Sequence, residues 1–148
     1  MPKQITLFEE SYARIFGDQV GITEAGDAFF ERFYDNFLNK SPRVAKMFSG
    51  TNMSRQATML RRSLYEFVTF YVTGQVNEEM RRIATLHQRL DISADLFDLW
   101  LDALIETVTE FDEECTELIE FAWRLAMAPG ITYVKLWGDT DRTPVDGP

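Results

Sequence analysis

The chain has 148 residues, a length that suits one domain with a core large enough to enclose a ligand. Its formal net charge of −9 argues against nucleic-acid and anionic-membrane partners, because both require clustered lysine and arginine. No run of about eighteen apolar residues and no basic-then-apolar leader occurs, so we expect a soluble, cytoplasmic protein. Aromatic residues make up 14% of the chain, which suits either dense core packing or a core built around a large flat ligand.

Apolar residues recur at helical spacing along most of the chain, and no segment alternates as a strand would. The predicted helices cover residues 5–16, 24–38, 42–48, 53–72, 78–90, 93–108 and 118–137. The sequence therefore predicts an all-α protein with six or seven helices.

Local signals place the ends of these helices. The expected N-caps are Thr23, Ser41, Asn52 and Asn77, and the expected stops are Gly17 and Gly74. Pro129 and Gly130 should interrupt the last helix and bend it near Ala126. We expect a single domain over residues 1–138 and a flexible tail over residues 139–148.

His87 is the only histidine, and it lies beside an apolar helical stripe formed by Ile83, Leu86 and Leu90. Taken alone, it could be a hydrogen-bonded core histidine or a metal ligand. Gln56 lies 31 residues earlier on the apolar side of the preceding long helix. Two antiparallel helices joined by a short link would bring Gln56 and His87 opposite each other.

Two aromatic residues add to this pair. Tyr34 contributes a hydroxyl from a helix whose other inward residues are apolar, and Phe48 ends the short turn that begins at Pro42. A buried tyrosine oxygen normally finds a partner. One imidazole facing a phenol and an amide across an aromatic cleft indicates a haem site with a single axial ligand.

These residues, in this order and spacing, resemble the globin family, and within it bacterial single-domain globins and the haem domain of flavohaemoglobins. The similarity covers roughly residues 29–136. It rests on Phe33-Tyr34, Ser41-Pro42, Phe48, Gln56 with Leu60, and Leu86-His87. The resemblance implies a globin fold, a 3-on-3 helical sandwich. The short helix that often follows Phe48 should be missing, because residues 49–52 leave no room for it.

The resemblance also implies a b-type haem and the residues around it. His87 would be the iron ligand, and Tyr34 and Gln56 would form the distal pocket. The full set of implied haem-pocket residues is Phe48, Tyr34, Gln56, Leu60, His87, Ile92, Phe97 and Leu101.

The sequence departs from the flavohaemoglobin pattern at the proximal side. Phe97 stands where that group has a tyrosine, and no glutamate matches near Trp137. We therefore expect His87 to donate its second ring nitrogen to a backbone carbonyl near Ile83 or Ala84, and to be a weaker electron donor. No reductase module is expected in the chain, so an electron donor would be a separate protein.

The resemblance implies reversible binding of a diatomic gas (O2, NO or CO) at a five-coordinate haem, with Tyr34 donating a hydrogen bond to bound O2. The alternatives are an NO dioxygenase or reductase served by a separate reductase, and a haem-based sensor. The chain could be a monomer, or a homodimer formed through exposed parts of Trp100 and Tyr133.

Two further features have simple structural interpretations. Basic residues gather at Arg55, Arg61 and Arg62 and again at Arg81, Arg82 and Arg89, and we interpret them as solvated helix faces unless the ligand carries acid groups. The single cysteine, Cys115, lies in an acidic run that disfavours the thiolate, so we expect an unreactive thiol.

Overall fold

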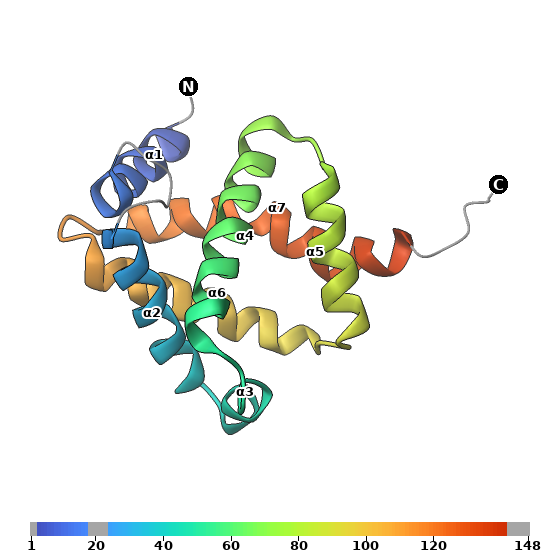
Figure 1. The fold of residues 1–148 in the computed structure, drawn as a ribbon. Coiled ribbons are helices and arrows are strands. Elements are labelled where there is room, and N and C mark those ends of the chain that lie inside the picture. Colours follow the sequence, from blue (N-terminus) through green and yellow to red (C-terminus); the bar gives the residue numbers. More distant parts are fainter. Residues whose placement is uncertain (1–2, 18–23, 142–148) are drawn as a thin grey trace.

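The computed structural model describes residues 3–17 and 24–141, and seven helices make up most of this part of the chain (Figure 1). These helices are α1 (Lys3–Phe16), α2 (Glu24–Leu38), α3 (Pro42–Met47), α4 (Met53–Thr73), α5 (Glu78–Arg89), α6 (Ala94–Phe111) and α7 (Glu117–Asp141). No strand occurs among these residues, so the all-α prediction is confirmed. None of the described helices is both long and apolar enough to cross a lipid bilayer.

The predicted capping side chains act as expected at three helices. The side chains of Ser41, Asn52 and Asn77 accept hydrogen bonds from backbone amides in the first turns of α3, α4 and α5. Gly74 ends α4 with a left-handed φ of 70°, a conformation that costs glycine little. The predicted cap at Thr23 lies outside the described residues.

Ser93 differs from these three capping residues. It precedes α6, but its side chain makes no capping bond to the helix backbone. Its hydroxyl instead donates to Asp95 Oδ1 at 2.7 Å and accepts from Arg43 at 2.7 Å. The Ser93 hydroxyl is therefore hydrogen-bonded to a carboxylate and a guanidinium and not to the amides of α6.

The helices form a sandwich in which α1, α4 and α5 cross α2, α6 and α7. The pairs α1 with α7, α2 with α4, α4 with α7 and α5 with α7 make most of the contacts between the two layers, and α1 with α2 adds a smaller one. Residues 49–52 form a tight connection between α3 and α4, so the short helix expected to be missing after Phe48 is indeed absent. In Figure 1, α4 and α5 run antiparallel, joined by residues 74–77.

The outer face of α6 is tied to its neighbours by ion pairs. Five carboxylates, spaced about one turn apart, each meet a cation from another segment, at nitrogen–oxygen distances of 2.7 to 3.6 Å. The pairs are Asp95 with Arg43, Asp98 with Lys135, Asp102 with Arg124, Glu106 with Lys40, and Glu110 with Arg32. Exposed pairs contribute little stability individually, but together these pairs neutralise the acidic face of α6.

A buried polar network joins α1, α7 and the end of α6. Asp112 is 1% exposed, and its carboxylate accepts two hydrogen bonds from Arg14 at 2.6 and 2.9 Å. Ser11 also donates to it at 2.6 Å and itself accepts from the Trp123 indole at 2.9 Å. Burial acts to raise the pKa of Asp112, but the hydrogen bonds from Arg14, Ser11 and the Glu114 amide together hold it below its ordinary value.

Cys115 lies three residues after Asp112 and is half-buried. Burial raises the pKa of its thiol, and the charges of Asp112 and Glu120 raise it further. The thiol therefore stays protonated at neutral pH, as the acidic run around it predicted.

The helix α7 is continuous through Pro129 and Gly130, although an interruption was predicted there. Pro129 lacks an amide hydrogen, so the carbonyl of Leu125 loses its usual partner. Leu125 is 37% exposed, and water can satisfy that carbonyl. The helix also extends to Asp141, which places three residues of the predicted tail in a helix; residues 142–148 lie outside the described part.

Gly130 has a packing role at the crossing of α4 and α7. A Cβ atom at this position would lie 2.7 Å from both Cγ and Cδ2 of Phe67 on α4. Phe67 is itself buried, and its ring centroid lies 5.9 Å from that of Trp100. The glycine therefore sets how closely α4 can approach α7.

Tyr133 cannot contribute to the predicted dimer surface, because it is buried. Tyr133 is 6% exposed, and its ring packs 6.1 Å from that of Phe70. Trp100 is half-buried between Phe33 and Phe67, with ring-centroid distances of 5.8 and 5.9 Å. Tyr133 therefore belongs to the core, whereas Trp100 packs against the core and keeps an exposed part, so its place in a dimer surface stays a prediction.

Substituting Gly130→Ala should destabilise the protein. Alanine favours a helix by about 1 kcal/mol over glycine, but the displaced Phe67 ring should cost about 1–3 kcal/mol and outweigh this gain. Chemical unfolding measures the difference, with the exposed Thr132→Ala on the same helix as the control. Restoration of the lost stability by adding Phe67→Leu would support the clash; a more stable Gly130→Ala protein would contradict it.

The Asp112 network predicts a pH-dependent stability. Because the folded-state pKa of Asp112 is lowered, its contribution is present above its unfolded pKa of about 4 and is lost as pH falls through the folded value. Asp112→Asn should lower the free energy of unfolding at pH 7 by about 1.5–3 kcal/mol. Urea titrations should show that the difference in the free energy of unfolding between the two proteins decreases as the pH falls below about 4. A difference that stays constant would show that the charge of Asp112 is unimportant. Glu113→Gln, which is exposed, is the control.

Candidate functional site

The imidazole of His87 is held by its own helix. Its Nδ1 atom lies 2.8 Å from the carbonyl oxygen of Ile83, one turn earlier in α5. In the tautomer that makes this bond, Nδ1 donates and Nε2 carries the lone pair. The arrangement matches the backbone bond predicted for His87 and leaves Nε2 as the atom available to a metal ion.

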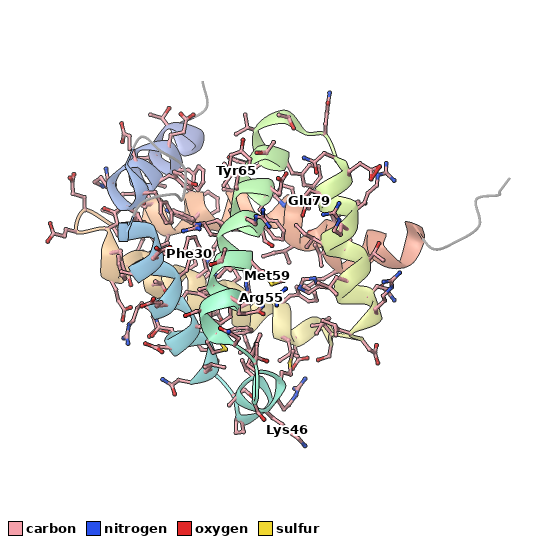
Figure 2. All side chains as sticks on the ribbon, viewed as in Figure 1. Phe30, Lys46, Arg55, Met59, Tyr65 and Glu79 are labelled. Atoms are coloured by element: carbon pink, nitrogen blue, oxygen red, sulfur yellow. The ribbon has the colours of Figure 1, made fainter. Side chains whose placement is uncertain are left out.

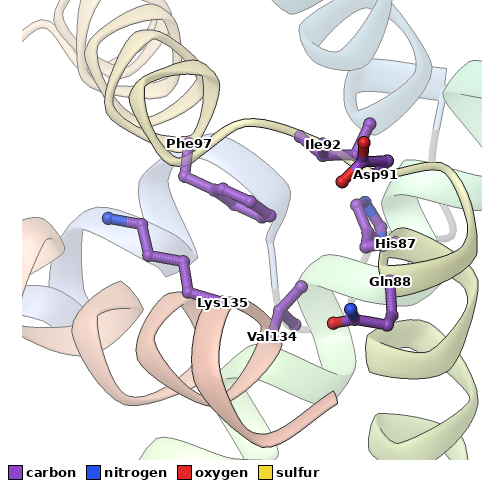
Figure 3. A pocket seen from close by; sticks show the side chains of 7 residues that line it. All are labelled: His87, Gln88, Asp91, Ile92, Phe97, Val134 and Lys135. Atoms are coloured by element: carbon purple, nitrogen blue, oxygen red, sulfur yellow. The ribbon is translucent and has the colours of Figure 1, made fainter. Parts of the chain in front are cut away.

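A small pocket of about 40 Å³ lies beside this imidazole (Figure 3). It is formed where the end of α5, the turn into α6 and the last part of α7 meet. Its lining residues are His87, Gln88, Asp91, Ile92, Phe97, Val134 and Lys135. Three of the residues predicted for the site, His87, Ile92 and Phe97, are thus brought together.

Phe97 is the nearest aromatic neighbour of the histidine. The two ring centroids are 5.9 Å apart, with a tilt of 42°. Lys135 Nζ lies 5.9 Å from the Phe97 centroid on its other side and 3.6 Å from Asp98. The histidine therefore packs against an apolar ring, which cannot hydrogen-bond to it.

A second group of predicted residues gathers on α2, α4 and the turn after α3. Tyr34 is 6% exposed, and its ring lies 5.6 Å from that of Phe48. The amide of Gln56 donates to the Tyr34 hydroxyl oxygen at 3.3 Å. Burial raises the pKa of Tyr34 to about 12, so the hydroxyl keeps its proton at neutral pH.

This bond determines what the tyrosine can do. Because the hydroxyl oxygen already accepts from Gln56, its own hydrogen remains to be donated elsewhere. The pair is thus a hydrogen-bond donor supported by a second polar group, in a largely apolar surrounding.

The remaining predicted residues lie on the flanking helices. Leu60, one turn after Gln56 on α4, is 6% exposed, and Leu101 on α6 is half-buried against the core. Met59, beside Leu60, is 41% exposed on the side of α4 towards α5 (Figure 2), and Leu86, beside His87, is 43% exposed. A flat apolar ligand could cover the exposed apolar side chains of Met59 and Leu86.

The two arginine groups behave largely as solvated helix faces. Arg61 pairs with Asp27 and Arg82 pairs with Glu79, while Arg55, Arg62 and Arg89 are exposed. Their guanidinium groups are thus outside the core, as expected from the sequence.

Four residues of the pocket were not predicted: Gln88, Asp91, Val134 and Lys135. Asp91 has a left-handed φ of 53°, which turns the chain from α5 towards α6 and directs Ile92 into the pocket. An aspartate just after a helix end is a recognisable signal for this conformation. Val134 and Lys135 come from α7, so only the packing of α7 on α5 reveals them.

The donor set fits a metal held within a larger organic group better than a bare ion. No cluster of three or more His, Cys, Asp or Glu that could hold a metal ion occurs among residues 3–17 and 24–141. A single oriented imidazole is instead the protein ligand that a haem iron requires. The pocket at His87 is smaller than a macrocycle, so a haem would also need the space bordered by the open apolar residues of α4 and α5.

Comparisons with known proteins agree with this geometry. No protein-family model and no curated protein sequence matches the chain. A solved structure from Pseudomonas aeruginosa PAO1, described as structurally highly homologous to a human hemoglobin, matches it with 32% identity and a TM-score of 0.76. The match covers 90% of this chain and 96% of the solved one. The sandwich of seven described helices and this match together show that the chain belongs to the globin family.

Proposed function

We propose that this globin binds a b-type haem through His87 Nε2 and uses it to bind O2 reversibly, with NO and CO as further ligands. The observation that carries the proposal is the bond of 2.8 Å between His87 Nδ1 and Ile83 O. That bond fixes the tautomer and the ring orientation needed for Nε2 to act as a metal ligand. A bound haem would supply the iron at which a diatomic gas binds.

Tyr34 and Gln56 supply the polar groups of the proposed gas pocket. A donor aimed at a ligand that gains negative charge on binding stabilises it, by about 1–3 kcal/mol. Tyr34 can make this donation because its oxygen accepts from Gln56 and its raised pKa keeps the proton in place. The pocket would thus favour slow release of O2.

The proximal side favours binding over oxidative chemistry. Ile83 O is a neutral backbone acceptor, and Phe97 packs against the ring at 5.9 Å without accepting a hydrogen bond. A carboxylate in either place would make the imidazole a stronger electron donor, which assists cleavage of an O–O bond. This difference supports a gas-binding function over a peroxidase-like one.

Replacing His87 with glycine tests the metal ligand. His87→Gly should lose the haem spectrum of the purified protein, because the remaining described residues offer no metal cluster to replace it. Added imidazole should restore the spectrum, since it can occupy the space left by the side chain. Glu78→Ala, at the exposed start of α5 and outside the pocket lining, is the control and should keep its haem.

Two outcomes of this experiment would contradict the assignment. Haem binding unchanged in His87→Gly would show that another residue holds the iron. Haem absent from the unaltered chain even after reconstitution would remove the gas-binding proposal.

The Tyr34 hydroxyl can be tested through the rate of O2 release. Tyr34→Phe keeps the ring packed against Phe48 but removes the donor, so O2 should dissociate about 5- to 150-fold faster. Stopped-flow displacement of O2 by CO measures this rate, and Tyr65→Phe, on the exposed face of α4, is the control. An unchanged rate would exclude Tyr34 as the donor.

A further inference from the structure

We propose that Arg43, Ser93 and Asp95 form a strap that controls how quickly haem enters and leaves this chain, an inference that rests on the haem binding proposed above. Arg43 lies on α3, and the other two residues lie at the start of α6. Arg43 Nη1 donates to Asp95 Oδ2 at 2.8 Å, and Arg43 Nη2 donates to the Ser93 hydroxyl oxygen at 2.7 Å. The Ser93 hydroxyl donates in turn to Asp95 Oδ1 at 2.7 Å. These three side chains are called the α3–α6 strap below.

Each end of the α3–α6 strap is joined to residues of the proposed site. On one side, α3 leads directly into Phe48, whose ring centroid lies 5.6 Å from that of Tyr34. On the other side, Ser93 directly follows Ile92, which lines the pocket at His87. In Figure 1, α3 and the turn from α5 into α6 lie on the same side of the molecule. The strap therefore connects the tyrosine side of the site to its histidine side.

The position of Ser93 shows that the link to α3 replaces an ordinary helix cap. Ser93 is the residue before α6 and has an extended backbone, the position at which a serine hydroxyl usually accepts a hydrogen bond from a first-turn amide. Its side chain makes no such bond and instead contacts Arg43 and Asp95. The hydroxyl therefore stabilises the strap and not the end of the helix.

The strap can open without unfolding the protein. Val44 is the one buried residue of α3, and the ion pair of Lys40 with Glu106 lies about three turns further along α6. The strap itself is exposed, with 57% of the Arg43 side chain and 58% of the Asp95 side chain accessible to solvent. Water and salt therefore compete for both charged groups. Opening would release the segment before Phe48 from the turn after α5 and widen the edge at which a flat ligand enters.

The strap is fully charged at neutral pH. Hydrogen bonds from Arg43 and Ser93, together with the charge of Arg43, hold the pKa of Asp95 down to about 2. The carboxylate is therefore ionised throughout the neutral range. Ionic strength, which screens exposed charges, should determine how often the strap is open.

Transfer of haem from the loaded chain to excess apomyoglobin, followed by absorption, tests the strap. Arg43→Ala should release haem about 2- to 10-fold faster than the unaltered chain, because the link between α3 and α6 is lost. Arg124→Ala is the matched control, since it removes another exposed arginine that pairs with α6, through Asp102. It should leave the rate unchanged, because Arg124 is outside the strap and the pocket lining. Equal rates for the two variants would overturn the proposal.

Two further measurements separate the strap from a general loss of stability. Raising the ionic strength from about 0.05 M to about 0.5 M should speed haem release from the unaltered chain towards the Arg43→Ala rate and change Arg43→Ala little. Arg43→Asp alone should release haem faster still, and combining it with Asp95→Arg should restore slow release. A release rate of the unaltered chain that ignores salt, or a double variant no slower than Arg43→Asp, would overturn the strap.

Failure of the strap can be distinguished from failure of haem binding. An unaltered chain that binds no haem would overturn both proposals, whereas haem released at equal rates from Arg43→Ala and Arg124→Ala would overturn the strap alone. Hydrogen exchange of the haem-free chain, measured by mass spectrometry, gives a readout without the cofactor. Arg43→Ala should increase exchange in residues 42–52 and 90–96, and Arg124→Ala should not. No increase in Arg43→Ala would show that the strap does not hold these segments and would overturn it.

Discussion

The hydrogen bond between His87 Nδ1 and Ile83 O is the constraint on which the proposed site depends. An imidazole can serve as a metal ligand through only one nitrogen at a time, and the atom it uses is decided by the partner of the other. Here the partner is the helix backbone one turn away, so the ring orientation is fixed by α5 itself. The position of α5 in the fold then decides where Nε2 lies.

Packing around α6 and α7 holds α5 in that position. The helix α5 lies on α7, α7 is anchored to α1 through the Asp112 network, and its close approach to α4 depends on Gly130. The ion pairs along α6 keep that helix against α2, α3 and α7. The two sides of the site therefore come from different layers: Tyr34 and Gln56 from α2 and α4, and His87 from α5.

Features set by neighbouring residues could be predicted from the sequence. The caps at Ser41, Asn52 and Asn77 and the histidine bond four residues back depend only on local geometry, and the structure contains them. Features set by distant residues could not. Val134 and Lys135 reach the pocket only because α7 packs on α5, and Tyr133 is buried because α7 also packs on α4. The continuity of α7 through Pro129 was also not predicted, because the helix tolerates the loss of one backbone hydrogen bond there.

The most direct test of the proposed site is to measure how many protein groups bind the iron of the ferrous protein. An absorption spectrum of the dithionite-reduced protein, before and after addition of CO, reports how many protein groups bind the iron. A five-coordinate ferrous haem that forms a CO complex is expected, since His87 is the single histidine and Gln56 is a poor iron ligand. A six-coordinate ferrous spectrum would show a second protein ligand and contradict a pocket kept open for gas by Tyr34 and Gln56.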